Sequence, residues 1–389
     1  MLMKIPYLLL LCFLNFQVTV SQTLSPTAEI SVLTIDPGTS LNDAFGHSGF
    51  RIKDNIQGID EVYGYGEYNF EDPNFYLKFA QGKLNYSISK DDFERFYRVY
   101  VYFNRTIKEQ TLNLDASQKQ KLYNFLLNNY KPENRAYLYD FFYDNCATKI
   151  RDVANTALGD NITFNTPKDY KPQSFRTLIH NNLNKNSWGS LGIDIALGSV
   201  IDRTATPVEQ IFLPENIHKF FSEATLIDGQ PLVSRSQVLF SEKKKVNASN
   251  LLLSPLFIIS LIALGIGWIT YSDYKKKKRT KWLDITLFSL TGLIGMFLLL
   301  LWFATDHTAT AHNYNLLWAF ALNVFMVGQL SSKQPKLWFI RYLKFLLIML
   351  CLLVFHWIIG VQVFAITLIP LLLALAIRYV FLVRFYKKL

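Results

Sequence analysis

Long apolar runs separated by short polar loops make up the last third of the chain, whereas the part before it alternates between short apolar and polar stretches. A membrane-spanning helix needs about 20 mostly apolar residues. The runs are Leu251–Tyr271, Trp282–Ala304, Asn315–Ser331, Leu337–Gly360 and Val361–Val383. They predict an all-α transmembrane domain of five helices over residues 249–389, of which the third is short.

The loops between these runs differ in charge. Six Lys and Arg residues lie within residues 275–281, whereas residues 305–314 contain none. Because basic loops stay in the cytoplasm, the chain before the first run is expected on the other side, in the periplasm of a bacterial inner membrane. Arg378 falls near a cytoplasmic end and is expected to snorkel. This placement accounts for a net charge of +10 without a nucleic-acid partner.

Residues 1–21 are typical of a signal peptide. Lys4 supplies the positive start, Tyr7–Phe16 the apolar stretch, and Thr19 and Ser21 the small residues before a cleavage site. A short membrane anchor is the alternative, but the apolar stretch is short for a span. Residues 22–248 are then an exported domain, long enough to bury its own core.

The exported domain mixes strands and helices. Ala28–Ile35 is expected to be a strand, and Gly49–Lys53 with Glu61–Tyr65 a hairpin. Helices are expected from about Pro73 to Gln81 and over Asp115–Tyr130. The pattern predicts an α+β domain.

One cysteine stands alone in this domain. Cys12 belongs to the predicted signal peptide and Cys351 to an apolar run, which leaves Cys146 without a disulfide partner in an oxidising compartment. Such a cysteine is an intermolecular bridge, a reactive thiol or a buried core residue.

The residues after Cys146 favour the reactive thiol. Apolar or small residues recur on one helical face, at Ile150, Val153, Ala154 and Ala157. Asp144 or Asn145 can cap this helix. Cys146 would then lie in the first turn, where backbone N–H groups and the helix dipole favour a thiolate.

A nucleophilic cysteine needs a base. His47 stands between Gly46 and Gly49 at the start of the hairpin, and glycines allow close backbone approach. His180 and His218 lie in polar stretches and are expected to be solvated. The candidate pair is therefore Cys146 and His47, with a structural histidine as the alternative.

A Gly-His pair on an early strand, followed much later by Asn-Cys at a helix start, resembles the circularly permuted papain-like fold of NlpC/P60 type. Lecithin:retinol acyltransferase-like enzymes share that order. The whole layout resembles the Lnb family of bacterial lipoprotein N-acyltransferases. The motifs that carry this resemblance are Gly46-His47-Ser48, Tyr63–Phe70, Asn74–Ala80, Pro132–Arg135, Tyr143–Thr148, Asp306-His307 and Asn313–Trp318.

The resemblance implies an α+β permuted papain-like exported domain, a five-helix membrane domain and an acyl transfer without metal or cofactor. Cys146 would take a fatty acyl group from a phospholipid as a thioester, and His47 would protonate the departing oxygen. The α-amine of a diacylglyceryl-modified lipoprotein cysteine would then attack. The Cys146 N–H and the Asn145 side chain are expected to stabilise the oxyanion. A membrane-anchored NlpC/P60-type cysteine hydrolase and a non-enzymatic envelope assembly factor are the alternatives.

Further site residues are less defined. The third catalytic residue comes from the following strand in the permuted families, and Tyr65 or Asn69 is expected to orient His47, with Tyr63 against the substrate. Asp306, His307, His312 and Asn313, on the exported side between the second and third runs, are also expected substrate-binding residues. This loop could instead contact the exported domain, hold a metal or be solvated.

Overall fold

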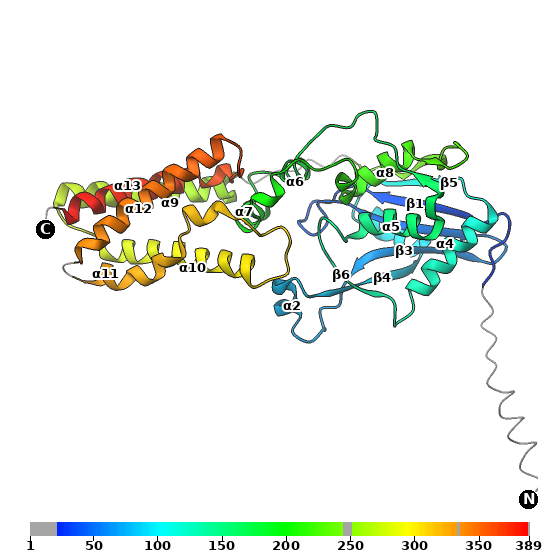
Figure 1. Ribbon diagram of the computed structural model, residues 1–389, viewed down its shortest axis with the longest axis horizontal. Coiled ribbons are helices and arrows are strands. Elements are labelled where there is room, and N and C mark those ends of the chain that lie inside the picture. Colours follow the sequence, from blue (N-terminus) through cyan, green and yellow to red (C-terminus); the bar gives the residue numbers. More distant parts are fainter. Residues whose placement is uncertain (1–21, 244–250, 333–334, 388–389) are drawn as a thin grey trace, which may run out of the picture.

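The computed structural model describes residues 22–243, 251–332 and 335–387. An exported α+β domain and a helical membrane domain lie end to end along the long axis of the molecule (Figure 1). The predicted signal peptide, and the predicted boundary at residues 248 and 249, fall outside the described residues.

A seven-stranded antiparallel sheet forms the centre of the exported domain, in the order β6-β4-β3-β2-β1-β5-β9. Its strands are β1 (Glu29–Ile35), β2 (His47–Asp54), β3 (Ile59–Glu67), β4 (Asn85–Asp92), β5 (Ile107–Leu112), β6 (Ala136–Leu138) and β9 (Val233–Phe240). The predicted first strand and hairpin are confirmed as β1, β2 and β3. Strands β7 (Ile162–Thr163) and β8 (Thr225–Leu226) pair separately.

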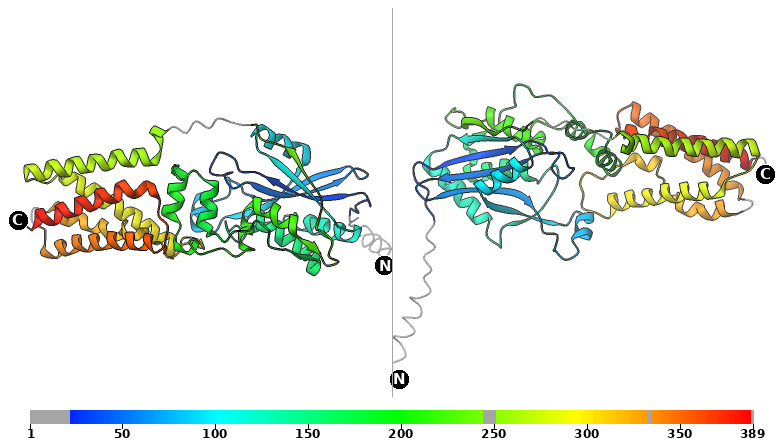
Figure 2. Two further views of the ribbon diagram at one scale, coloured as in Figure 1. Left: turned by 90° about the horizontal axis from the view of Figure 1, so that it is seen from above. Right: turned by 180° about the vertical axis from the view of Figure 1, so that it is seen from behind.

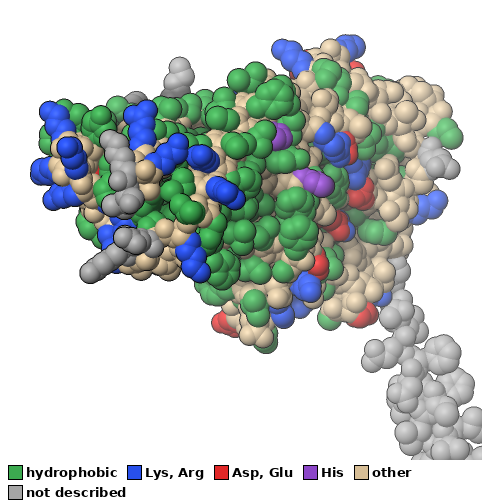
Figure 3. Space-filling model, turned by 60° about the vertical axis from the view of Figure 1, so that its left-hand side comes forward, with side chains coloured by type: hydrophobic (Ala, Val, Ile, Leu, Met, Phe, Trp, Pro, Cys, Tyr) green, Lys and Arg blue, Asp and Glu red, His purple; other side chains and the backbone are tan. Residues whose placement is uncertain are grey.

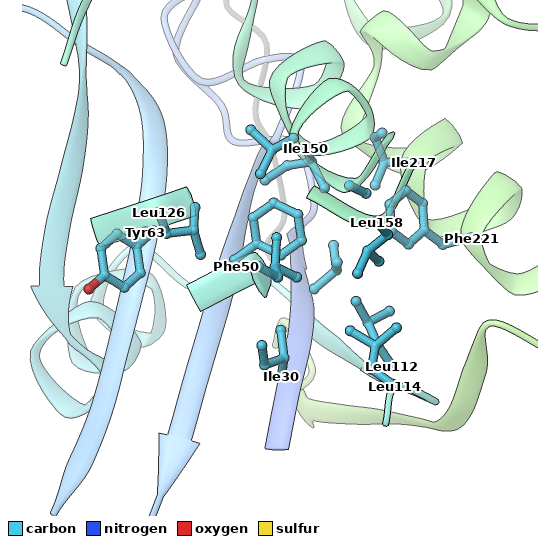
Figure 4. Close-up of a cluster of buried hydrophobic side chains, with 14 of the residues drawn as sticks. Ile30, Phe50, Tyr63, Leu112, Leu114, Leu126, Ile150, Leu158, Ile217 and Phe221 are labelled. Carbon is cyan, nitrogen blue, oxygen red and sulfur yellow. The ribbon is translucent and has the colours of Figure 1, made fainter. Parts of the chain in front are cut away.

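Three helices cover one face of this sheet, α4 (Ala116–Asn129), α5 (Cys146–Leu158) and α8 (Pro214–Glu223). Phe50 from β2, Ile150 from α5 and Phe221 from α8 meet in the core between these layers (Figure 4). Side chains alternate along a strand, so the opposite face carries its own small cluster. There Leu33 and Val62 pack against Phe96 of α3 (Phe93–Tyr102). The predicted helices over 73–81 and 115–130 are confirmed as α2 (Phe75–Gln81) and α4.

Two short helices, α6 (Phe175–Asn182) and α7 (Trp188–Ala196), link the sheet to the membrane domain. Arg176 is fully buried there and pairs with Asp194 and Asp202 at 2.9 and 2.8 Å. Asp202 also accepts a hydrogen bond from the Val363 N–H of the membrane domain. His180, expected to be solvated, instead bonds Asp194 at 2.9 Å. The two domains therefore share one buried polar centre.

Four helices of the described membrane domain are long and apolar enough to cross a membrane. They are α9 (Pro255–Lys276), α10 (Lys281–Phe303), α12 (Leu337–Ile358) and α13 (Ile369–Tyr386). They run along the long axis away from the sheet in all three ribbon views (Figure 2). The expected third span is not one continuous helix. Residues 314–331 instead form three short helical pieces, η5 (Tyr314–Leu317), η6 (Ala321–Met326) and α11 (Val327–Ser331).

This broken segment still follows α10 from end to end. Lys281, which begins α10, donates to the Ser331 carbonyl at 2.7 Å. Farther along, a Cβ on Gly295 would lie 2.0 Å from the Ala319 carbonyl oxygen, so only glycine allows this backbone contact. Non-helical backbone at membrane depth is tolerated where protein buries it, and the contact with α10 provides that burial.

Lys and Arg side chains gather at the end of the membrane domain that lies away from the sheet (Figure 3). The loop between α9 and α10, with its run of basic residues, lies at this end. The positive-inside rule therefore places the sheet domain on the outer side of the membrane.

Arg378 does not snorkel, contrary to expectation. It is fully buried, and its guanidinium donates to Asp284 at 2.6 Å and to Asp273 at 2.8 Å. These three residues come from α13, α10 and α9, so the ion-pair cluster fastens three helices together. A charge is tolerated at this depth because it is paired.

Replacement of Arg378 by Met leaves two buried carboxylates without their main partner. We expect a loss of about 3–5 kcal/mol, the usual effect of breaking a buried ion pair from one side. Thermal unfolding of the full chain in detergent measures it. Arg384→Met is the matched control, since Arg384 lies exposed on the same helix. Equal melting temperatures for the two variants would contradict the structural role.

Candidate active site

Cys146 is fixed at the first position of α5 by its neighbour Asn145. The Asn145 Oδ1 accepts hydrogen bonds from the backbone N–H groups of Ala147 and Thr148, at 2.8 and 2.9 Å. The Thr148 hydroxyl accepts in return from the Asn145 N–H, which completes a capping box. The predicted helix start is thus confirmed, with Asn145 as its N-cap.

The rest of the Asn145 amide is also occupied. Its Nδ2 donates to the carbonyls of Phe141 and Phe212, at 2.7 and 2.8 Å. An amide nitrogen has two hydrogens, so none is left for an oxyanion. The expectation that this side chain stabilises the oxyanion is therefore wrong, and the remaining donors near the sulfur are backbone N–H groups.

Cys146 and His47 line the same cavity, of about 460 Å³, which we call the thiol cavity. The thiol is half-buried, and the backbone N–H of Ser48, the residue after His47, hydrogen-bonds its sulfur. The structure thus brings the start of β2 against the start of α5. The other walls are mostly aromatic and include Phe75, Tyr76 and Phe79 from α2.

Two glycines of β3 make room for this pair. A Cβ on Gly64 would lie 3.1 Å from the His47 Nε2, and a Cβ on Gly66 would lie 4.0 Å from the Cys146 Cβ. Gly66 has a φ of +100° and sits at an irregularity between Tyr65 and Glu67, as in a β-bulge. His47 and Cys146 therefore each approach β3 at a position that carries no side chain.

Burial dominates the electrostatics of the site. It raises the pKa of the Cys146 thiol to about 11, although backbone N–H groups and the charge of Arg105 act in the opposite direction. Burial, together with the nearby charge of Arg105, lowers the pKa of His47 to about 4. At neutral pH the resting pair is therefore a thiol and a neutral imidazole. The backbone N–H groups at the helix start favour the thiolate as expected, but burial has the larger effect on the pKa.

Arg105 and Tyr100 both act on His47, and no sequence pattern indicates either residue. The ring of Tyr100 stacks on His47 with centroids 6.4 Å apart, and the Arg105 guanidinium lies 5.0 Å from the Tyr100 ring. Arg105 donates through Nε to the Asp36 carbonyl, and its buried Nη2 has no hydrogen-bond partner in the described part of the chain. These contacts come from three separate elements, so only the tertiary fold reveals them.

The expected partners of His47 lie elsewhere. The Tyr65 hydroxyl donates to Asn129 at 2.6 Å, and Asn69 is exposed in a loop where it accepts from the Glu71 N–H. Tyr63 is fully buried and does not line the thiol cavity. Tyr63 and Tyr65 both belong to the core cluster under α4 and α5. Tyr65 also lines the thiol cavity, but its hydroxyl is bound to Asn129 and not to His47.

The loop after α10 contacts the exported domain, one of the alternatives left open above. His307 hydrogen-bonds the Phe79 carbonyl at 3.1 Å, and the Asp306 N–H donates to the Gln81 carbonyl. Asn313 is buried and donates to two carbonyls at the end of α7, while the His312 carbonyl accepts from the Ser199 N–H. Among the described residues no three His, Cys, Asp or Glu side chains lie together as a metal site would require.

Comparison with known families agrees with this architecture. A model described as the Lnb N-terminal periplasmic domain matches residues 17–181, and one described as the Lnb transmembrane domain matches residues 246–389. The chain belongs to the Lnb family. The two matches support its classification as an Lnb-type lipoprotein N-acyltransferase. No curated protein and no solved structure gives a significant match.

The family defines the class of protein. Membership suggests an acyltransferase that acts in lipoprotein N-acylation. A periplasmic domain followed by a membrane domain with four candidate spans fits an inner-membrane protein. The permuted papain-like fold stays a prediction.

The raised pKa of Cys146 can be tested by alkylation. The thiolate is the reactive form, so the rate with iodoacetamide should rise about tenfold per pH unit from neutral pH towards pH 11. Peptide mass spectrometry of a Cys351→Ser protein follows Cys146 alone. The urea-unfolded chain is the control, and its rate should level off at lower pH. A rate in the folded protein that is already constant at neutral pH would show a resting thiolate instead.

Proposed function

We propose that this protein transfers a fatty acyl group from a phospholipid, through a thioester on Cys146, to the α-amine of a diacylglyceryl-modified lipoprotein cysteine. The observation that carries the proposal is the thiol cavity itself. A thiol and an imidazole share it, and its opposite wall is an aromatic helix beside the membrane domain. Family membership supports the same reaction class.

The helix α2 gives lipids a path to the thiol. Tyr76, Leu77 and Phe79 leave 78, 57 and 54% of their surfaces exposed, which is unusual for a water-facing helix. Backbone contacts hold the end of α2 against the loop that follows α10, at the outer end of a membrane-spanning helix. Aromatic side chains favour this interfacial depth. The cavity thus borders the outer leaflet, where both lipid substrates reside.

Two proton transfers through His47 balance the reaction. His47 Nε2 lies against Gly64, so we assign the proton exchange with Cys146 to Nδ1. In the first step the thiol proton passes to His47, the sulfur attacks the ester carbonyl, and the departing glycerol oxygen takes the proton, which releases a lysophospholipid. In the second step the amine attacks the thioester, the C–S bond breaks, and His47 returns the amine proton to the sulfur.

Ser89 is the best candidate for the residue that orients His47. Its hydroxyl and the His47 Nε2 lie 3.2 and 3.1 Å from the place that a Gly64 Cβ would occupy. The hydroxyl belongs to β4, one strand beyond β3, and it reaches this place because position 64 has no side chain. Ser89 would hold the ring by accepting from Nε2–H, and so acts as a positioning residue.

Mass spectrometry of lipoprotein N-terminal peptides tests the function. In cells that carry only the Cys146→Ser protein, N-acylation should be lost, and His47→Ala should lower the rate by about 10²–10⁴-fold, the usual contribution of a general base. Cys351→Ser is the matched thiol control and should keep full activity. An acyl adduct on Cys146 should be trapped in the wild-type protein when the acceptor is absent.

Three results would overturn the proposal. N-acylation that persists without the protein excludes the transferase. Release of free fatty acid or cleaved peptide without an N-acyl product indicates a hydrolase. Full activity of Cys146→Ser leaves only an assembly role.

The role of Ser89 has its own test. Ser89→Ala should lower kcat roughly fivefold, the effect of one hydrogen bond of about 1 kcal/mol, with KM unchanged. Ser89→Thr keeps the hydroxyl and should restore kcat. A loss in both variants alike, or a change in KM alone, would mean that Ser89 only packs against β3.

A further inference from the structure

A second cavity, of about 380 Å³, lies between the exported domain and the loop after α10. Its walls come from α2, from the segment before α5, from α7 and from residues 306–310. Ile193 of α7 and Ala309 of the membrane domain line it from the two domains. We call it the junction cavity, because both domains are needed to form it.

The junction cavity adjoins the thiol cavity. Six side chains line both, namely Leu41, Phe45, Phe79, Tyr86, Tyr139 and Phe141. All six are apolar or aromatic. A chain attached to the sulfur would pass only such side chains on its way from one cavity to the other.

Four polar side chains in the wall of the junction cavity are already engaged, while the exposed Asp306 carboxylate lies 3.9 Å from Lys83. Asp140 accepts from the backbone N–H groups of Phe142 and Tyr143 and from the Thr308 hydroxyl. The His307 ring bonds the Phe79 carbonyl, and the Thr310 hydroxyl donates to the Leu301 carbonyl. A polar ligand would find few free partners here, whereas a hydrocarbon chain needs none. The volume lies within the range of about 300–1,000 Å³ that ligand sites occupy.

We propose that the junction cavity holds the hydrocarbon chain of the acyl group while its carbonyl carbon is bonded to Cys146. This assignment rests on the proposed function. It gives the inter-domain contact a chemical role, since the chain end lies against side chains of the membrane domain. The size of the cavity then limits which acyl chains form a productive thioester.

Substitutions at Ile193 test the assignment in two directions. Ile193→Trp narrows the junction cavity and should shift the acyl adduct on Cys146, and the N-acyl group on lipoproteins, towards shorter chains. Ile193→Ala widens it and should shift both towards longer chains. Val200→Trp is the matched control, because Val200 packs in the same apolar cluster but does not line the cavity. Full-length proteins in vesicles of mixed-chain phospholipids supply all lengths at once, and mass spectrometry measures the distribution.

The outcomes separate the two proposals. If wild-type protein carries no acyl adduct, the proposed function fails. If the wild type is acylated and both Ile193 variants keep its chain-length distribution, the function stands and the cavity assignment is overturned. If thermal unfolding shows that Ile193→Trp does not fold, the chain-length shift in Ile193→Ala alone decides whether the cavity assignment holds. This smaller side chain leaves the surrounding backbone in place. A shift in Val200→Trp equal to that in the Ile193 variants would also overturn it.

Discussion

The site depends on one side chain that never touches a reacting atom. The Asn145 amide makes four hydrogen bonds, two to the first N–H groups of α5 and two to the carbonyls of Phe141 and Phe212. The first two fix where the helix begins, and the last two fasten that beginning to the chain on either side of the cavity. Such a network keeps the thiol in one position because every donor and acceptor of the Asn145 amide has a hydrogen-bond partner. The position of Cys146 is therefore set by the hydrogen bonds of Asn145.

Burial then decides the chemistry of the pair. A helix start favours a thiolate, but here the apolar surroundings outweigh that effect and keep both groups neutral. A neutral pair suits a reaction with lipids, since no resting charge needs water in the cavity. In the proposed reaction the thiolate would arise only as the ester carbonyl arrives and His47 takes the proton. Exclusion of water would also protect the proposed thioester from hydrolysis and so favour transfer to an amine.

The sequence was sufficient for local features and insufficient for those that depend on tertiary partners. Helical spacing after Cys146 and the cap at Asn145 are short-range signals, and both were confirmed. The direction of Tyr65 was not accessible, because it depends on which face of the sheet carries α4 and α5. The predicted oxyanion role of the Asn145 side chain is wrong because nothing in the sequence places the Phe212 carbonyl beside its amide. Composition also cannot distinguish a straight apolar helix from residues 314–331, whose broken backbone is stable only against Gly292 and Gly295 of α10.

The membrane domain does more than anchor an enzyme. A tether would need one helix and no fixed contact with the sheet. Instead Asp202 binds both Arg176 and the Val363 N–H, and a Cβ on Gly198 would lie 1.8 Å from the Ala311 carbonyl oxygen, so the two domains meet closely at several points. These contacts hold α2 and the thiol cavity at a fixed position relative to the membrane-spanning helices. A thioester enzyme whose donor and acceptor both stay in the membrane gains from such a fixed position, because the reacting carbonyl can reach the sulfur while its hydrocarbon chain never has to cross water.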